Sequence, residues 1–122
     1  MAGEARSRPD LQVVLDALDD GGCRKIVRSL TEPMSAKEVA ERCDIPLTTT
    51  YRKLELLETA SLVDEQTEIR SDGHHTNRYR NDFEELRVKL DDGREFSVSV
   101  TRPNRSADER LADLWTEVRR ET

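Results

Sequence analysis

The sequence has few aromatic residues, little lysine and only two cysteines. Aromatic residues make up 4% of its 122 residues, and four of its 20 basic residues are lysines (Lys25, Lys37, Lys53 and Lys89). A core with so few aromatic side chains is small and aliphatic. The length and this composition therefore predict one modest domain, of a kind that often gains stability by forming a dimer.

Long apolar runs are also missing. No run approaches the roughly 20 residues that a membrane-spanning helix needs. The N-terminal sequence M-A-G-E-A-R-S-R-P has no apolar core of a signal peptide. We therefore expect a cytoplasmic protein with no membrane partner, in which Cys23 and Cys43 are reduced.

The charge balance lacks the basic excess that is usual in nucleic-acid-binding proteins. The chain carries 26 acidic residues and a net charge of -6. An acidic surface with little lysine fits a protein adapted to molar intracellular salt, where the Debye length is about 3 Å and distant charges are screened. In such a halophilic protein a few cations placed directly on phosphates still allow DNA binding, so the acidity does not exclude it.

Apolar residues at helical spacing predict four helices in the first half of the chain. The first begins at the capping residue Asp10 and ends at Asp19-Asp20-Gly21-Gly22, and the second begins near Gly22. Ser35 and Glu38 form the capping-box pattern of a third helix. Asp44-Ile45-Pro46 then makes a tight turn before a fourth helix over residues 47–59, so the third and fourth helices read as a helix-turn-helix.

Alternating apolar residues after the fourth helix predict two β-hairpins. One covers residues 62–81 and occupies the position of a wing, and the other covers residues 84–101 with its turn at Asp91-Asp92-Gly93. Residues 1–9 are expected to form a flexible tail and residues 105–122 a C-terminal helix. The predicted fold is therefore α+β, a winged helix-turn-helix domain over residues 10–104 with an extra hairpin.

The segment I-P-L-T-T-T-Y-R-K-L-E-L-L-E-T-A-S-L-V, from Ile45 to Val63, resembles the recognition helix of ArsR-type regulators. It shares their Ser/Thr-rich start, basic middle, paired leucines and exit into a wing. Ser61 stands where these regulators usually have glycine, which tolerates a left-handed backbone, so we expect some strain there. The resemblance covers about residues 10–81 and implies a homodimeric transcriptional regulator of haloarchaeal type that binds a pseudo-palindromic site in double-stranded DNA.

By motif position, the resemblance implies a DNA-contacting set on the fourth helix and on the wing. Hydroxyl and methyl groups of threonine suit phosphates and thymine methyls, and cations suit phosphates. The implied contacts are Thr48, Thr49, Tyr51, Arg52 and Lys53 on the helix and Arg70, His74, His75 and Arg78 on the wing. Thr50, Leu54 and Leu57 lie on the opposite helix face and are expected to be buried.

The predicted C-terminal helix carries a stripe of large apolar residues that is either part of the monomer core or a dimer contact. Because the domain is otherwise poor in large side chains, we favour a dimer interface formed with the first helix. Its expected residues are Leu11, Leu15, Leu111, Leu114, Trp115 and Val118.

Cys23 is the one candidate for redox chemistry. It lies near a helix start beside Arg24-Lys25, where thiol pKa values fall, and some halophilic regulators that resemble this chain respond to oxidants. The alternative is a buried, inert thiol on the stripe with Ile26 and Val27. Cys43 is expected to be a core residue, because the second cysteine of the metal-sensing Cys-x-Cys motif of ArsR-type repressors is missing.

No cofactor motif, metal-ligand set or catalytic grouping is evident in the sequence, so we expect no enzyme, cofactor or metal. The adjacent His74 and His75 lack further ligands that would complete a metal site. Two rival functions stay open. One is a winged helix that binds other proteins of the transcription machinery without reading DNA, and the other is a small enzyme that uses Cys23 or the histidine pair.

Overall fold

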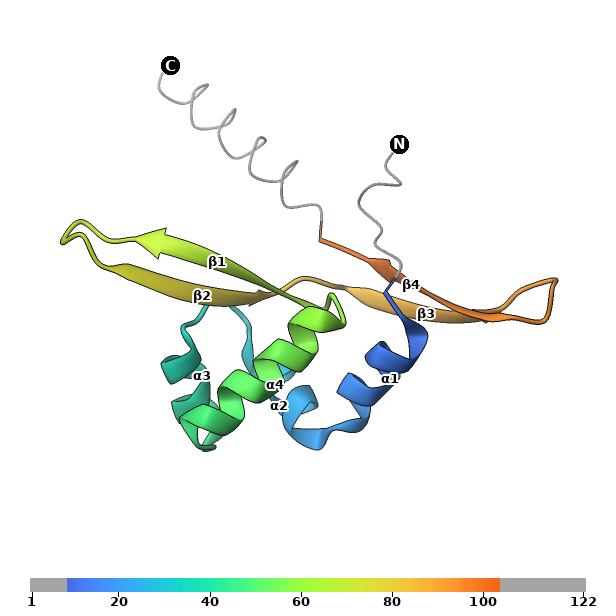
Figure 1. The fold of residues 1–122 in the computed structure, drawn as a ribbon, viewed down its shortest axis with the longest axis horizontal. Helices are drawn as coiled ribbons and strands as arrows, with labels where there is room; N and C mark the ends of the chain where they lie inside the picture. The colour runs from blue at the N-terminus through green and yellow to red at the C-terminus, as the bar shows by residue number, and fades with distance from the viewer. Residues whose placement is uncertain (1–8, 104–122) are drawn as a thin grey trace, which may run out of the picture.

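The computed structural model describes residues 9–103 of the chain. Four helices lie on one side of two antiparallel hairpins, and the hairpins extend in opposite directions (Figure 1). The predicted C-terminal helix, with Leu111, Leu114, Trp115 and Val118, lies outside the described residues. The elements are α1 (Leu11–Asp19), α2 (Gly21–Ser29), α3 (Ala36–Cys43), α4 (Leu47–Thr59), β1 (Val63–Ile69), β2 (His75–Asn81), β3 (Glu85–Leu90) and β4 (Phe96–Thr101).

The first three helices start at side chains that cap them. Asp10 accepts hydrogen bonds from the backbone N–H groups of Gln12 and Val13, and Ser35 forms a complete capping box with Glu38. Such caps satisfy backbone donors that have no partner within the helix. The predicted starts at Asp10 and Ser35 are therefore confirmed.

The junction between α1 and α2 is short, and α2 begins at Gly21, close to the predicted start near Gly22. Asp20 alone separates the two helices, ending α1 and capping α2 through a 3.1 Å bond from the Cys23 N–H. Gly21 and Gly22 therefore lie in the first turn of α2. A side chain at position 22 would meet Lys53, since a Cβ built there lies 2.7 Å from Lys53 Cε. The glycine thus permits the close approach of α2 and α4.

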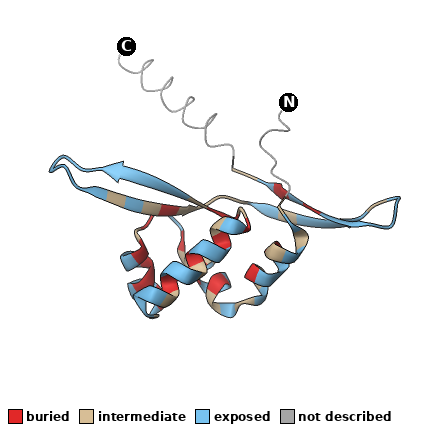
Figure 2. Ribbon diagram, viewed as in Figure 1, coloured by how far each residue is buried: buried red, intermediate tan, exposed pale blue. Residues whose placement is uncertain are grey.

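The core lies between the four helices and the roots of the two hairpins (Figure 2). Its packing is aliphatic, as the composition predicts, with Tyr79 as its buried aromatic side chain. Thr50 is fully buried, and its hydroxyl donates a 2.9 Å hydrogen bond to the Pro46 carbonyl oxygen. The fully buried large side chains include Val14, Ile26, Val39, Leu54, Leu57, Leu62 and Val100.

The exit from α4 into β1 has the backbone conformation expected from the sequence. Ser61 has a φ of 63°, in the left-handed region that glycine adopts at little cost. Its carbonyl oxygen accepts a 2.6 Å hydrogen bond from the Arg102 guanidinium, which also bonds the Asp82 carbonyl at 3.0 Å. Arg102 follows β4, so this contact ties the end of the second hairpin to the start of the first.

Each hairpin is anchored at its root. In the β1–β2 hairpin, Tyr79 exchanges two backbone hydrogen bonds with Met34, of 2.7 and 2.9 Å, just before α3. In the β3–β4 hairpin, Val98 and Val100 are buried and β4 packs against α1. The helix-turn-helix is therefore flanked by two arms whose outer halves project from the body.

Candidate nucleic-acid interface

Helix α4 presents two chemically different faces. Thr50, Leu54 and Leu57 are buried against the other helices, as predicted. Thr48, Tyr51 and Arg52 are exposed on the outer side, with Tyr51 52% exposed, and Thr49 is partly exposed. The outer face therefore offers hydroxyls, a phenol ring and a guanidinium to a ligand.

The start of α4 differs from the starts of the other three helices. Its N-cap residue is Pro46, which makes no side-chain capping hydrogen bond. The first backbone N–H groups of a helix have no partner within it and carry a partial positive charge. An anion such as a phosphate is the natural partner of such an end, and Thr48 and Thr49 lie in this first turn.

Lys53 lies on a different side of α4 from Arg52. Its ammonium is 2.8 Å from both carboxylate oxygens of Asp20, and its side chain is only 15% exposed. The ion pair lowers the pKa of Asp20, mainly through the hydrogen bond from Lys53. Lys53 therefore has an acidic partner within the protein, and this ion pair links α4 to the junction of α1 and α2. Arg52, in contrast, is exposed on the outer face of α4.

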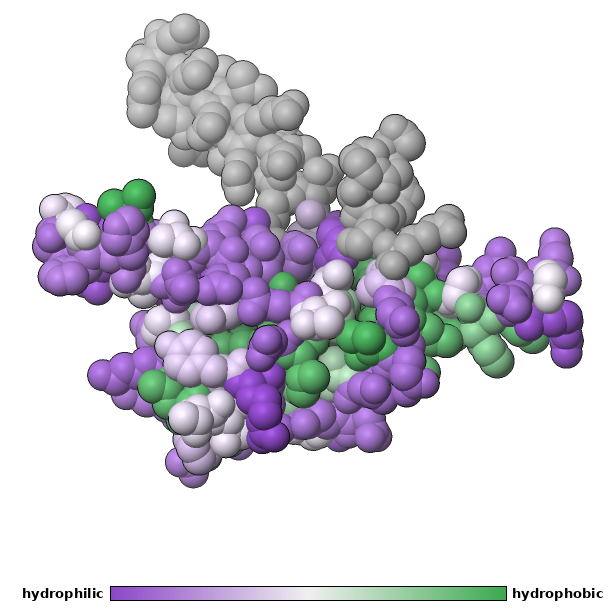
Figure 3. All heavy atoms as spheres, in the orientation of Figure 1, coloured by the Kyte–Doolittle hydropathy of each residue, from purple (hydrophilic) through white to green (hydrophobic). Residues whose placement is uncertain are grey.

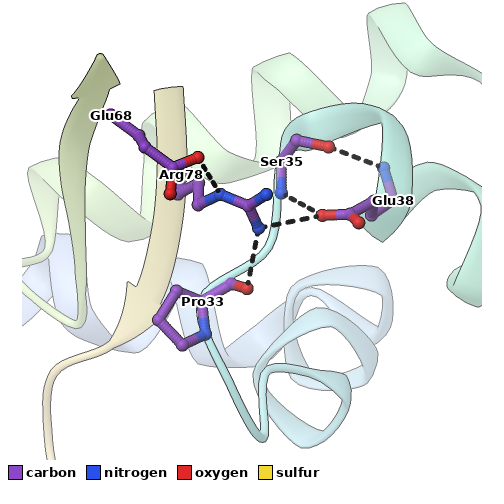
Figure 4. Close-up of polar contacts among 5 residues, drawn as sticks. All are labelled: Pro33, Ser35, Glu38, Glu68 and Arg78. Atoms are coloured by element: carbon purple, nitrogen blue, oxygen red, sulfur yellow. Dashed lines mark hydrogen bonds and ion pairs between the residues drawn. The ribbon is translucent and has the colours of Figure 1, made fainter. Parts of the chain in front are cut away.

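Arg78 is likewise held by acidic partners. Its guanidinium bonds Glu68 on the neighbouring strand at 3.0 Å, and Glu38 and the Pro33 carbonyl at 3.4 Å each (Figure 4). Glu38 is itself the capping-box residue of α3, where it accepts the Ser35 N–H at 2.8 Å. Arg78 thus braces the first hairpin against α3 instead of pointing outward from it.

The tip of the β1–β2 hairpin carries the other predicted wing residues. Arg70, His74 and His75 are all exposed. The turn is closed by hydrogen bonds from the Arg70 N–H to the His74 carbonyl, 2.8 Å, and from the Gly73 N–H to the Arg70 carbonyl, 2.9 Å. Asp72 accepts the His74 backbone N–H and lies 3.2 Å from its Nδ1, and these hydrogen bonds lower the pKa of Asp72.

A polar groove joins α3, α4 and the wing. It has a volume of about 420 Å³, and its lining includes Lys37, Tyr51, His75 and Asn77. Lys37 and Asn77 are functional candidates that the sequence analysis missed. Lys37 lies in the first turn of the helix-turn-helix, where a pattern-based reading could have noted it, whereas Asn77 is brought there only by the strand register.

The basic residues around this groove differ in whether they form an ion pair with another described side chain. Among residues 9–103, Lys37, Arg52 and Arg70 make no ion pair with another described side chain, whereas Lys53, Arg78 and Arg80 do. An unpaired cation can neutralise a phosphate without first losing an acidic partner. The structure thus divides the basic residues of this region into an outward-facing group and an internally paired group.

The far half of α4 is acidic. Glu58 lies beside Glu65 of β1, and burial together with its hydrogen bond and proximity to Glu65 raises the pKa of Glu58 to about 7. Glu55 is exposed on the same half of the helix. Carboxylates repel phosphates, so a DNA-binding surface on α4 is restricted to its N-terminal half, from Thr48 to Arg52.

Cys23 does not have the environment of a reactive thiol. It is fully buried, and its Sγ lies 3.9 Å from the Lys53 carbonyl oxygen. Burial raises the pKa of the Cys23 thiol, and the nearby Asp20 carboxylate raises it further, which favours the alternative of a buried, inert thiol over a reactive one. Cys43 is also fully buried, with its Sγ 3.4 Å from the Ser29 hydroxyl, in agreement with its expected place in the core.

Comparison with known families adds to this geometry. Residues 18–66 match a family model described as a helix-turn-helix domain. Residues 18–66 are therefore similar to a helix-turn-helix domain, and α3, the turn after it and α4 have that arrangement. The matched region runs from the end of α1 into β1 and includes the whole α3-turn-α4 unit, in keeping with the ArsR-like resemblance. No curated protein matches the chain.

Domains of this family are typical of DNA-binding transcriptional regulators, which are generally not enzymes. The α+β architecture of four helices and two hairpins agrees with a winged helix-turn-helix that carries an additional hairpin. Within residues 9–103, no helix combines the length and apolar character needed to cross a bilayer.

Proposed function

We propose that the protein is a sequence-specific regulator of transcription that binds a pseudo-palindromic site in double-stranded DNA as a homodimer. The observation that carries the proposal is the exposed, uncapped N-terminal half of α4 beside a polar hairpin, within a matched helix-turn-helix domain. In this arrangement the helix enters the major groove and the hairpin reaches the adjacent backbone.

Each part of the surface has a distinct role in the proposal. Thr48 and Thr49 approach phosphates and thymine methyl groups from the first turn of α4, while Tyr51 and Arg52 reach base edges and backbone. Arg70, His74 and His75 contact the backbone from the wing, and Lys37 contacts it from α3. Lys53 and Arg78 instead hold α4 and the wing in position.

A dimer compensates for the small number of unpaired cations. Among the described residues of the proposed interface, Lys37, Arg52 and Arg70 are the cations without an ion pair, which corresponds to about six neutralised phosphates per dimer, and the salt slope of DNA binding scales as roughly 0.9 per phosphate. Affinity for DNA in concentrated salt must then come from close contacts of the recognition helix, which each of the two protomers makes once. Recognition helices of a two-fold dimer lie about 34 Å apart, which predicts half-sites one helical turn apart.

Gel-shift titration in molar KCl tests the proposal. Sheared genomic DNA selected on the immobilised protein should yield a pseudo-palindromic sequence, and Arg52→Ala should weaken its binding by about 10–100-fold. Arg87→Ala is the matched control, because Arg87 is an exposed cation on the other hairpin, paired with Glu85. Equal binding by both variants, or no selected sequence, would contradict the proposal.

The alternative of a protein-interaction module draws on the acidic surface of α4 and β1, where Glu58, Asp64 and Glu65 line a polar pocket of about 580 Å³. This alternative predicts that the protein selects no sequence from genomic DNA in the same assay. It also predicts that the protein binds a basic protein partner and that Arg52→Ala does not weaken this binding.

Regulation through a thiol, the finer form of the hypothesis, depends on Cys23. Because that thiol is buried and its pKa is raised, we expect oxidant-treated protein and Cys23→Ser to bind the selected DNA like untreated wild type. Oxidant-sensitive binding that Cys23→Ser abolishes would establish the switch.

A further inference from the structure

The β3–β4 hairpin has one wholly apolar face. Its register pairs Leu86 with Val100, Val88 with Val98, and Leu90 with Phe96. Side chains directly opposite each other in an antiparallel pair lie on the same face. These six residues therefore form one continuous apolar surface along the hairpin, and the other face carries Glu85, Arg87, Lys89, Ser97, Ser99 and Thr101.

Only the inner part of this surface is covered. Val100 is 1% exposed and Val98 is 6% exposed, because the body of the domain packs over the root of β4. Val88, Leu90 and Phe96 are 54%, 43% and 66% exposed. One face of the hairpin is thus part of the core at its root and is exposed to water at its outer end. Exposure of apolar surface to water is unfavourable in proportion to the exposed area.

The wing shows that this overhang is not a general property of hairpins in the protein. Beyond its root, the β1–β2 hairpin is polar on both faces, and Ile69 is its one large exposed apolar side chain. Because the β3–β4 hairpin is apolar and uncovered while the β1–β2 hairpin of similar length is polar, the exposed apolar face indicates a binding partner for the β3–β4 hairpin.

The uncovered surface continues from the hairpin onto the body. Figure 3 shows hydrophobic atoms along the side of the β3–β4 hairpin that faces α1 and on the adjoining part of the domain. On α1, Leu15 is 45% exposed, and Leu11 is only partly buried. Both residues are predicted dimer contacts, so the hairpin face adjoins the helix for which a second copy is already expected.

We infer that the outer apolar face of the β3–β4 hairpin, formed by Val88, Leu90 and Phe96, is a contact surface for a second copy of this chain. The inference deepens the proposed homodimer by locating part of its interface. In a two-fold dimer the same patch serves both partners, so an apolar patch meets an equally apolar one. The flanking charges, Arg87 and Lys89 with Glu85 and Glu95, include both signs, so they do not by themselves oppose self-association.

The size of the patch also fits part of a dimer interface. A few exposed side chains amount to a few hundred Å², about the largest patch of an ordinary monomer and below the roughly 800 Å² per partner of a stable dimer. The remainder is expected from Leu11 and Leu15 and from the predicted C-terminal stripe. Apolar contact also persists in concentrated salt, where ion pairs are screened.

The position of the hairpin is compatible with DNA binding. The β1–β2 and β3–β4 hairpins project from opposite sides of the body (Figure 1). A second copy seated on the β3–β4 hairpin therefore leaves the wing uncovered. Such a dimer carries one wing at each end, as a two-fold DNA reader requires.

Sedimentation equilibrium of the full chain in molar KCl tests the inference. Phe96→Glu should raise the dimer dissociation constant at least about 30-fold, as expected for loss of a central aromatic contact. Ile69→Glu is the matched control on the wing and should leave that constant within about two-fold. Val88→Glu, on the paired strand, should reproduce the Phe96→Glu result, and circular dichroism should show that all three variants fold.

DNA titrations separate this inference from the proposed function. Phe96→Glu should bind an isolated half-site like wild type and lose the tighter binding to the paired site. A wild-type chain that is monomeric would overturn the inference. Dimers that persist in Phe96→Glu and Val88→Glu would also overturn it, and would indicate that the chain's own C-terminal segment or another protein covers the face. If the wild-type protein selects no DNA sequence but both substitutions still dissociate its dimer, the interface is upheld and the proposed function is refuted.

Discussion

The two hairpins have the same antiparallel topology but opposite surface chemistry. Both have buried roots, at Tyr79 in one and at Val98 and Val100 in the other. Beyond the root, the β1–β2 hairpin is polar on both faces and ends in Arg70 and two histidines, whereas the β3–β4 hairpin keeps an apolar face to Phe96. The difference teaches that buried roots attach both hairpins to the same core, while their outer halves are free to differ in polarity. We propose that this polarity matches different partners, DNA for the wing and a second copy of the chain for the β3–β4 hairpin.

Substitutions at the roots should have the largest effect. Tyr79→Ala should destabilise the fold by about 3 kcal/mol, because it removes a buried ring from the core. Val100→Ala should cost about 1–2 kcal/mol for the same reason. Urea denaturation checks both values against Ile69→Ala, whose 72% exposed side chain should change stability by less than about 0.5 kcal/mol. A neutral Tyr79→Ala would mean that the wing is not anchored in the core.

Removing one cation from each tip should separate the two arms by function. Arg70→Ala should weaken DNA binding about 3–10-fold and equally for all sequences, because a phosphate contact carries no sequence information. Arg94→Ala, at the turn of the β3–β4 hairpin, should leave DNA binding unchanged. Fluorescence anisotropy with specific and random duplexes provides the measurement, and equal losses from both variants would remove the distinction between the arms.

The acidic pair at the root of the wing should make stability depend on pH. The folded-state pKa of Glu58 is about 7, above its ordinary value of 4.5. The folded protein therefore holds this proton more tightly, and the stability that it contributes is lost as the pH rises from about 4.5 through about 7. Glu58→Gln should consequently be more stable than wild type by about 1 kcal/mol at pH 8, allowing for solvent screening.

Thermal unfolding followed by circular dichroism at pH 5 and pH 8 measures this difference. The advantage of Glu58→Gln should shrink markedly at pH 5, where the wild-type carboxyl is protonated in the folded state. Glu41→Gln is the control, because Glu41 is an exposed carboxylate on α3 and does not contribute to the shift of Glu58. An advantage of Glu58→Gln that does not change with pH would show that the carboxyl pair does not retain a proton in the folded protein.

Relief of backbone strain should have the smallest effect. Ser61 and Arg94 have φ values of 63° and 69°, which glycine adopts without a Cβ clash. Ser61→Gly and Arg94→Gly should each stabilise the protein by up to about 1 kcal/mol, less the entropy that glycine adds to the unfolded chain. Urea denaturation measures both changes, and a gain only at position 94 would show that the backbone at Ser61 carries no strain that glycine relieves.

Much of the local structure follows from the sequence. The apolar spacing and the residues Asp10, Ser35 and Pro46 locate the helices, because capping and periodicity act within a few residues. The turn residues and alternation locate both hairpins for the same reason. Burial of Thr50 and the left-handed backbone at Ser61 also follow from the sequence, from the helix face in one case and from the resemblance in the other.

The tertiary structure decided which charged side chains are available. Lys53 and Arg78 are basic residues in the expected DNA-binding segments, yet Asp20 holds the first, and Glu38 and Glu68 hold the second. These partners lie 33, 40 and 10 residues away in the sequence. A pattern within one segment cannot detect such pairing, and it equally cannot place Asn77 beside Lys37.

The sequence by itself therefore determined the order of helices and hairpins and the polar face of α4, since these depend on neighbouring residues. Only the tertiary structure decided that Cys23 is buried, that α4 begins without a side-chain cap whereas the other helices of residues 9–103 have one, and that the apolar face of the second hairpin is covered at Val100 and exposed at Phe96. The physical reason is that burial and ion pairing depend on which distant segments pack together, and a chain specifies that packing as a whole.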